Sequence, residues 1–246
     1  MDISVVTSIL PKLFISDASA AIQLDVLRAY NITHIVNVTT EVDCLFAESI
    51  QYCHLPISAL EAEDPEGLFL DMALSFIESA ISTGGDNTNV LVHCVNGVSR
   101  SVAVAIYYLM TVRNMHFHEA YHFVRSKHSI AFPSQALITI LVNKVYTARP
   151  LPEGPAVEVL HFIMSLQGPE VPIEHIAQIL RNHHGQVPSA LTELHQTALV
   201  GKVNEWMRDR MGCARRESLV PIPDESYASD DQVGLSPRRS PTPPFH

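Results

Sequence analysis

Apolar residues along the chain follow two different spacings. Short runs rich in β-branched residues, at 32–38, 52–57 and 90–92, are typical of buried strands. Elsewhere apolar residues recur every three or four positions, as they do over 68–81, and this spacing predicts helices with one buried face. Strands that alternate with helices predict an α/β fold whose central, mostly parallel sheet is flanked by helices.

The same two spacings predict the remaining elements of the first 146 residues. Two further short strands are expected at 5–6 and 13–15, separated by Pro11. Further helices are expected from Ser16 or Asp17 to about Tyr30, and at 101–113, 117–127 and 134–146.

The pattern changes after the proline-rich segment 149–152. Helical spacing returns at 157–166, 173–182 and 190–211, and from Cys213 onward the chain is polar and rich in proline. We expect the helices to pack on the preceding domain or on a partner protein. The expected parts are an α/β domain (1–149), a helical extension (150–212) and a disordered Pro/Ser-rich tail (213–246).

Composition limits the kinds of function to consider. The 246 residues carry a formal net charge of −10, which opposes binding to nucleic acid or to an anionic membrane surface. The four cysteines show no close-spaced pair, so neither a disulfide framework nor a zinc site is indicated. No leader pattern and no membrane-length apolar run is present. We therefore expect a cytoplasmic or nuclear protein without a metal or cofactor.

Chemistry concentrates in the segment His93–Ser101, between the predicted strand at 90–92 and the next predicted helix. A loop in this position gathers free backbone N–H groups and the positive end of a helix dipole, which together bind an anion. Cys94 opens the loop, and Arg100 closes it with a guanidinium fork that matches phosphate oxygens in pairs. Such surroundings lower a thiol pKa from about 8.5 to roughly 3.5–7.5, so we expect Cys94 to be a thiolate nucleophile.

This loop resembles the signature loop of the cysteine-based protein tyrosine phosphatases. The run His93-Cys94, five residues, then Arg100-Ser101 carries the resemblance, and the ending Gly97-Val98-Ser99-Arg100-Ser101 is similar to the small dual-specificity branch. The resemblance extends from about Ser4 to Tyr146 and includes the segments 33–38, 52–57 and 119–125.

The resemblance implies a phosphotyrosine protein phosphatase-like fold and a metal-free reaction. Cys94 would form a phosphocysteine that water hydrolyses, Ser101 would assist the second step, and His93 would support the loop from behind. The equatorial phosphate oxygens would be bound by the loop residues Val95, Asn96, Gly97, Val98, Ser99 and Arg100.

The general acid of the family lies on a loop that precedes the signature. Here Pro56 is followed by Ile57, Ser58 and Ala59, so the aligned position carries no carboxylate. Three carboxylates follow closely (Glu61, Glu63 and Asp64), and Glu61 is favoured because it lies nearest the aligned position.

The sequence thus predicts a phosphatase acting on phosphotyrosine, phosphoserine and phosphothreonine in proteins. Two alternatives are a pseudophosphatase or phosphoprotein-binding module with weak turnover, and an RNA 5'-phosphatase, which the net charge disfavours. The expected partners are a phosphoprotein substrate, a protein docking on 150–212, and a proline-directed kinase acting on Ser236, Ser240 or Thr242, since each precedes a proline.

Overall fold

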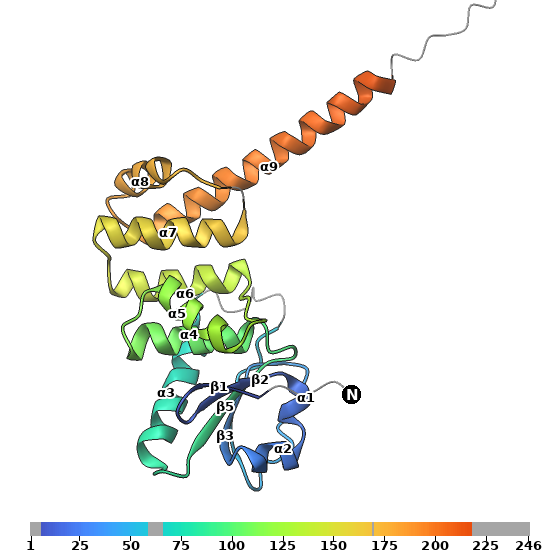
Figure 1. The fold of residues 1–246 in the computed structure, drawn as a ribbon, viewed down its shortest axis with the longest axis vertical. Helices are drawn as coiled ribbons and strands as arrows, with labels where there is room; N and C mark the ends of the chain where they lie inside the picture. The colour runs from blue at the N-terminus through green and yellow to red at the C-terminus, as the bar shows by residue number, and fades with distance from the viewer. Residues whose placement is uncertain (1–5, 59–65, 169, 218–246) are drawn as a thin grey trace, which may run out of the picture. The chain divides into compact units, whose positions relative to one another are not determined.

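The computed structural model describes residues 6–58, 66–168 and 170–217 of the chain. Within this part, five strands form one sheet in the order β1-β2-β5-β3-β4 (Figure 1). The pairs β2–β5, β5–β3 and β3–β4 are parallel, and only the edge pair β1–β2 is antiparallel. The strands are β1 (Thr7–Leu10), β2 (Leu13–Ser16), β3 (Ile32–Asn37), β4 (Gln51–His54) and β5 (Asn89–His93). The predicted mostly parallel α/β sheet is confirmed.

Helices cover both faces of this sheet. The helices that the structure describes are α1 (Ala18–Ala21), α2 (Leu24–Ala29), α3 (Leu68–Thr83), α4 (Arg100–Val112), α5 (Phe117–Lys127), α6 (Gln135–Ala148), α7 (Glu153–Gln167), α8 (Ile173–Asn182) and α9 (Val187–Glu217). Within the described residues, no helix has the length and apolarity needed to span a membrane.

Alternation along the central strand explains the two covered faces. In β5, Leu91 packs with Leu27 of α2 in one apolar cluster, whereas Val90 and Val92 join the larger cluster that includes α3 to α6. Successive side chains of a strand point to opposite faces, so a fully apolar strand must be covered on both sides. Figure 1 shows α1 and α2 on one side of the sheet and α3 and α4 on the other.

Helix α4 is buried along nearly its whole length and is fixed by two hydrogen bonds to α3. The Tyr107 hydroxyl donates to Asp71 and the Tyr108 hydroxyl donates to Glu78, each at 2.6 Å. Burial raises the pKa of Tyr108 to about 12, so this phenol stays a donor at neutral pH. Because α4 begins at Arg100, these contacts also fix the end of the loop that carries the predicted chemistry.

Several element boundaries differ from the sequence-based expectation. The single helix expected to run to about Tyr30 is two helices, because Gln23 has an extended backbone (φ −111°, ψ 105°) between α1 and α2. The first described strand is Thr7–Leu10, which does not include Val6, whereas Val5 of the expected strand at 5–6 lies outside the described residues. Strand β4 ends at His54 rather than at 57. Helix α9 continues to Glu217, past the residue where the disordered tail was expected to begin. The predicted phosphorylation sites Ser236, Ser240 and Thr242 lie outside the described residues.

The helices after residue 150 continue the main apolar core. Residues up to Gly201 form one compact unit, and the core cluster runs from the sheet through α7 and α8 into the first turns of α9. Phe162 of α7 packs against Tyr121 of α5, with ring centroids 5.5 Å apart in an edge-to-face arrangement. Of the two expectations for this extension, packing on the preceding domain is the one that the structure shows.

Candidate active site

The segment His93–Ser101 lies where three parallel strands end. Ser16 at the end of β2 and Asn37 at the end of β3 are both in register with His93 at the end of β5. The loops after these strands therefore meet at one edge of the sheet, where open α/β sheets place their ligands. The loop after β5 contains Cys94, and α4 begins at Arg100 directly behind it.

Four backbone carbonyl groups of this loop accept hydrogen bonds from outside it. The carbonyls of His93, Val95 and Val98 accept hydrogen bonds from the backbone amides of Val38 (3.0 Å), Ala18 (3.0 Å) and Phe132 (2.9 Å). The Gly97 carbonyl accepts from Nε2 of His128 at 2.8 Å. Since this ring donates through Nε2, its Nδ1 accepts from the Thr7 hydroxyl at 2.8 Å when the ring is neutral.

The backbone amides of the same loop are free to donate hydrogen bonds to a ligand. No amide from Val95 to Arg100 donates a hydrogen bond to another group in the described part of the chain. Consecutive free amides at a helix N-terminus form a concave anion site. The structure thus brings together the loop residues that the sequence assigned to phosphate binding.

Gly97 is required by two features of this loop. Its φ of +67° is a conformation that residues with a Cβ rarely adopt. A Cβ at this position would also lie 3.0 Å from the Asp17 amide nitrogen and 3.1 Å from the Ser16 carbonyl oxygen. The loop therefore packs directly on the backbone that joins β2 to α1, with no room for a side chain.

Cys94 and Ser101 face each other at the base of the loop. The Cys94 sulfur lies 3.2 Å from the Ser101 hydroxyl oxygen, and both residues are buried, with exposures of 2% and 0%. A hydroxyl at this distance can donate to a thiolate and can later stabilise it as a leaving group. The structure thus brings Cys94 and Ser101 together.

His93 lies beneath the loop as an uncharged ring. Burial lowers the pKa of His93 to about 4, so the imidazole is neutral at physiological pH. Its Nδ1 is buried and has no hydrogen-bond partner within the described residues. This geometry fits a residue that packs against the loop as a neutral ring.

Arg100 is held by two groups that come from other loops. Its Nη1 donates to the Ile57 carbonyl and to Oε2 of Glu41 (3.2 Å), and its Nη2 donates to Oε1 of Glu41 (3.4 Å). Arg100 is buried, with an exposure of 6%. Glu41 was not predicted from the sequence. Its position soon after the predicted strand at 32–38 was a usable signal, because parallel strands end at a common edge of the sheet.

Glu41 does not fit the role of the missing general acid. The hydrogen bond from Arg100 is the main reason why the pKa of the Glu41 carboxyl lies below its ordinary value, and this favours the carboxylate over the proton donor. The predicted candidates Glu61, Glu63 and Asp64 lie outside the described residues, so the acid stays a prediction.

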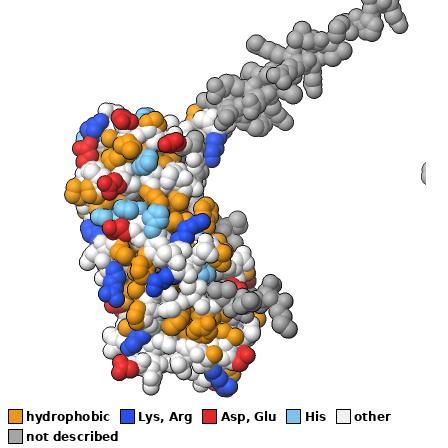
Figure 2. Space-filling model, in the orientation of Figure 1, with side chains coloured by type: hydrophobic (Ala, Val, Ile, Leu, Met, Phe, Trp, Pro, Cys, Tyr) orange, Lys and Arg blue, Asp and Glu red, His pale blue; other side chains and the backbone are white. Residues whose placement is uncertain are grey.

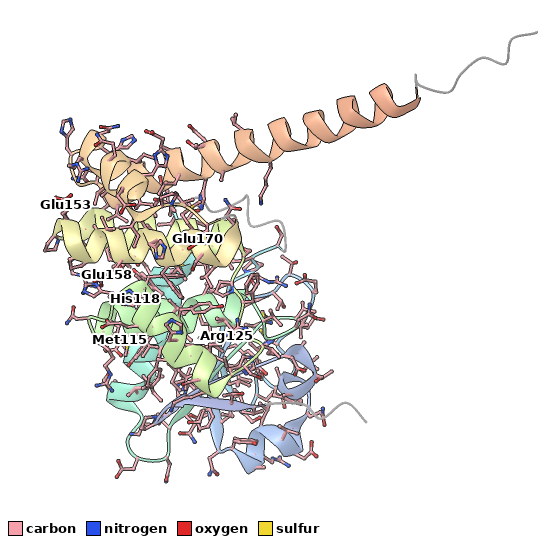
Figure 3. The ribbon with its side chains drawn as sticks, turned by 45° about the horizontal axis from the view of Figure 1, so that its top comes forward. Met115, His118, Arg125, Glu153, Glu158 and Glu170 are labelled. Carbon is pink, nitrogen blue, oxygen red and sulfur yellow. The ribbon has the colours of Figure 1, made fainter. Side chains whose placement is uncertain are left out.

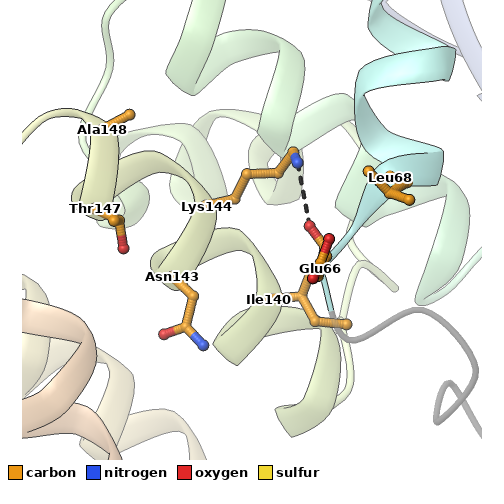
Figure 4. A pocket seen from close by; sticks show the side chains of 7 residues that line it. All are labelled: Glu66, Leu68, Ile140, Asn143, Lys144, Thr147 and Ala148. Atoms are coloured by element: carbon orange, nitrogen blue, oxygen red, sulfur yellow. Dashed lines mark hydrogen bonds between the residues drawn. The ribbon is translucent and has the colours of Figure 1, made fainter.

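A pocket outside the loop at 93–101 also contains charged side chains. It is lined by Glu66, Leu68, Ile140, Asn143, Lys144, Thr147 and Ala148 (Figure 4). The Lys144 ammonium group of this pocket already has partners, since its Nζ lies 2.7 Å from Asp71 and donates to the Glu66 carbonyl at 3.1 Å. None of the residues that line this pocket belongs to the loop at 93–101.

Histidines form a band on one face of the molecule (Figure 2). His118 of α5 lies at the contact with α7 and is labelled in Figure 3, together with Arg125 of α5 and Glu158 of α7. The rings of His118 and His122 pack against Phe162 with centroids 6.2 and 4.8 Å away. In the described ranges, no three His, Cys, Asp or Glu side chains meet in a way that would hold a metal ion.

Comparison with known proteins agrees with this geometry. The family model described as dual specificity phosphatase, catalytic domain, matches residues 13–145. Dual specificity protein phosphatase 6 of Homo sapiens is 39% identical over 128 residues, which cover 51% of this chain and 32% of that protein. Dual specificity protein phosphatase 1B of Arabidopsis thaliana is 34% identical over 129 residues, which cover 52% of this chain and 75% of that protein.

A similar fold is found among solved structures. The crystal structure of human DUSP28 matches with a TM-score of 0.53 and 28% sequence identity, over 58% of this chain and 95% of the other. The chain thus spans nearly all of this compact relative, but only about a third of the longer human phosphatase 6.

Proposed function

The chain belongs to the dual specificity phosphatase family, and from this premise we propose that it hydrolyses phosphate esters of tyrosine, serine and threonine side chains in proteins. The observation that carries the proposal is the run of amides from Val95 to Arg100, in the loop that begins at Cys94, which donate to no group in the described part of the chain. Such donors stabilise charge on the equatorial oxygens of a phosphoryl group without a metal ion.

The proposed reaction has two steps. The Cys94 thiolate attacks phosphorus, an S–P bond forms, the P–O bond to the side chain breaks, and the leaving oxygen takes a proton from the general acid. Water then attacks the phosphocysteine and gives a proton back to the deprotonated general acid, the S–P bond breaks, and inorganic phosphate and the thiolate are released. Ser101, 3.2 Å from the sulfur, supports the thiolate as it leaves.

Replacement of the nucleophile tests this proposal most directly. Cys94→Ser should abolish turnover of a phosphotyrosine peptide and retain its binding, because the amides and the guanidinium are still in place. Arg100→Lys should lower kcat/KM on the order of 10²–10³-fold, since a point charge does not replace the fork. Cys53→Ser, at a half-buried cysteine of β4, is the control expected to keep turnover.

Different results would change the proposal in defined ways. Turnover by Cys94→Ser would exclude Cys94 as the nucleophile. A wild-type protein that binds the phosphopeptide and shows no turnover would be a phosphoprotein-binding module. Hydrolysis of phosphotyrosine but not of phosphoserine or phosphothreonine peptides would restrict the proposed specificity to tyrosine.

We propose Glu61 as the general acid. Support comes from Ile57, whose carbonyl accepts a hydrogen bond from Arg100, so that the chain passes the site four residues before Glu61. Four residues span at most about 14 Å, so a chain that folds back toward the site from Ile57 can bring a side chain at 61 to the leaving group. Glu61→Gln should lower kcat about 10²–10⁴-fold on an alkyl phosphate but little on para-nitrophenyl phosphate, whose leaving group needs no proton. If Glu63→Gln or Asp64→Asn lowers kcat on the alkyl phosphate as much as Glu61→Gln, the general acid is no longer assigned to Glu61.

A further inference from the structure

We propose that Glu41 is a positioning residue that aims the Arg100 guanidinium at the phosphate, an inference that rests on the proposed function of this site. Glu41 lies on the loop after β3, far from the signature loop in sequence. Its carboxylate contacts both terminal nitrogens of Arg100, at 3.2 and 3.4 Å.

A count of N–H donors shows which edge of the guanidinium is left for a ligand. Arginine has five N–H donors, and three of the Arg100 donors are used by Glu41 and by the Ile57 carbonyl. Both Glu41 contacts are on the edge between Nη1 and Nη2, and the remaining Nη1 proton goes to Ile57. The Nε–H and one Nη2–H are left, and they lie side by side on the same edge.

This remaining edge is itself a two-point fork for phosphate. No described group accepts a hydrogen bond from Nε of Arg100. Two parallel N–H donors match two oxygens of a phosphoryl group. Glu41 therefore engages the guanidinium without using the edge that a phosphate dianion requires.

The Glu41 loop is built as a firm support. Asn37, which is fully buried at the end of β3, donates to the Val42 carbonyl (2.6 Å) and accepts from the Thr39 hydroxyl (2.8 Å). The Val42 amide donates to the same Thr39 hydroxyl (3.1 Å), and the Thr40 amide donates to Oε2 of Glu41 (2.9 Å). The Glu41 carboxylate therefore accepts hydrogen bonds from the Thr40 amide and from Arg100, which together fix its orientation.

Burial distinguishes the two partners and indicates the direction of control. The side chain of Arg100 is 8% exposed, whereas that of Glu41 is 43% exposed. The buried guanidinium has few other acceptors, so loss of Glu41 would let it rotate or turn to water, whereas the carboxylate would remain solvated without Arg100. Orientation therefore passes from the Glu41 loop to Arg100, and from Arg100 to the substrate.

The experiment uses the full chain and a double-mutant cycle with Arg100→Lys. Hydrolysis of para-nitrophenyl phosphate gives kcat and KM, and competition by inorganic phosphate gives its affinity. Glu41→Ala should lower kcat/KM about 10- to 100-fold and weaken phosphate binding, because a displaced fork loses both contacts, and Glu41→Gln should lie between it and wild type. The Arg100→Lys background has no guanidinium to position. There Glu41→Ala and Glu41→Gln should lower kcat/KM by less than about twofold.

The controls separate this inference from the function on which it rests. Glu48→Gln, at an exposed carboxylate later on the same segment, should leave both readouts unchanged. Tighter phosphate binding in Glu41→Ala would overturn the inference and make Glu41 a competing anion. An equal loss with and without Arg100 would also overturn it, as would an unchanged kcat/KM. If wild type shows no turnover, the proposed function fails, and phosphate binding measured on the same variants still decides the role of Glu41.

Discussion

The loop at 93–101 and the helices after residue 150 are ordered by different forces. In the loop, four hydrogen bonds from three neighbouring segments hold the carbonyls of His93, Val95, Gly97 and Val98. In α7 and α8, order comes from apolar side chains that continue the main core. A loop held by directional bonds keeps its amides in a fixed geometry, whereas a packed helix surface tolerates small shifts of position.

This difference predicts how the two regions respond to substitution. Small displacements in the loop should reduce activity more than stability, because amide geometry sets how well transition-state charge is stabilised. Loss of volume in α7 should reduce stability and leave turnover by the folded protein unchanged. Each prediction below tests one side of this comparison.

The largest effect is expected at Gly97. Gly97→Ala places a Cβ at a φ of +67° and 3.0 Å from the Asp17 amide nitrogen, so the loop must move away from the β2–α1 backbone. A shift on the order of 1 Å should lower kcat/KM about 10²-fold. Steady-state turnover of para-nitrophenyl phosphate measures this change, and inorganic phosphate binding should weaken with it.

Gly85 provides a matched control for this substitution. Its φ is +65°, yet a Cβ there meets no atom within 4 Å. Gly85→Ala should therefore cost about 1–2 kcal/mol of stability from backbone strain and leave kcat/KM unchanged. If both variants lose activity equally, strain rather than loop placement is the cause, and the comparison fails.

A pH-dependent loss of stability is expected from His93. Burial lowers its pKa to about 4 in the folded protein, from an ordinary value of 6.5. Between these two values the unfolded chain binds more protons than the folded protein. The contribution of the neutral His93 ring to stability is therefore fully present above pH 6.5 and decreases as the pH falls toward 4. At pH 5 the loss should be about 2 kcal/mol, at about 1.4 kcal/mol for each pH unit below 6.5.

Urea unfolding of wild type and His93→Asn at pH 7 and pH 5 measures this contribution. The variant should be less stable at pH 7, but the drop between the two pH values should be smaller by about 2 kcal/mol. Burial also lowers the pKa of His34 and His195, so part of the drop will persist in the variant. An identical drop in both proteins would show that His93 is not the group that titrates.

The sequence predicted those parts of the site that depend on local order along the chain. Cys94, Arg100 and Ser101 lie within one strand–loop–helix unit, so a motif contains their geometry. Glu41 was missed because it is 59 residues from Arg100 and meets it only through the parallel pairing of β3 with β5. Register between strands is set by the whole sheet, and no short pattern encodes it.

Helix boundaries followed the same rule. Helix α5 was predicted with its observed bounds, because its apolar face is continuous. The break between α1 and α2 was missed because the apolar spacing runs through it, while the backbone turns at Gln23. There the Gln23 amide nitrogen donates to the Ala20 carbonyl at 3.2 Å, and its side chain donates to the Ser19 carbonyl at 2.7 Å. A side chain that satisfies the end of one helix allows a second helix to begin.

The smallest effect is expected in the packed region, at Phe162. Its ring contacts Phe117, Tyr121 and His122 of α5 with centroids 6.2, 5.5 and 4.8 Å away. Truncation of a fully buried Phe costs about 3–5 kcal/mol, and because Phe162 is only partly buried we expect Phe162→Ala to cost about 1–2 kcal/mol. Urea unfolding measures this loss, and Leu199→Ala, at a side chain that is 64% exposed, should change stability by less than about 0.5 kcal/mol. The activity of the same variant tests the comparison between the two regions. The kcat of folded Phe162→Ala should equal that of wild type, because none of the described hydrogen bonds that hold the loop at 93–101 comes from α7. A clear fall in kcat, with stability little changed, would mean that the extension helps to shape the phosphate site through α5 and would remove the distinction between the two regions.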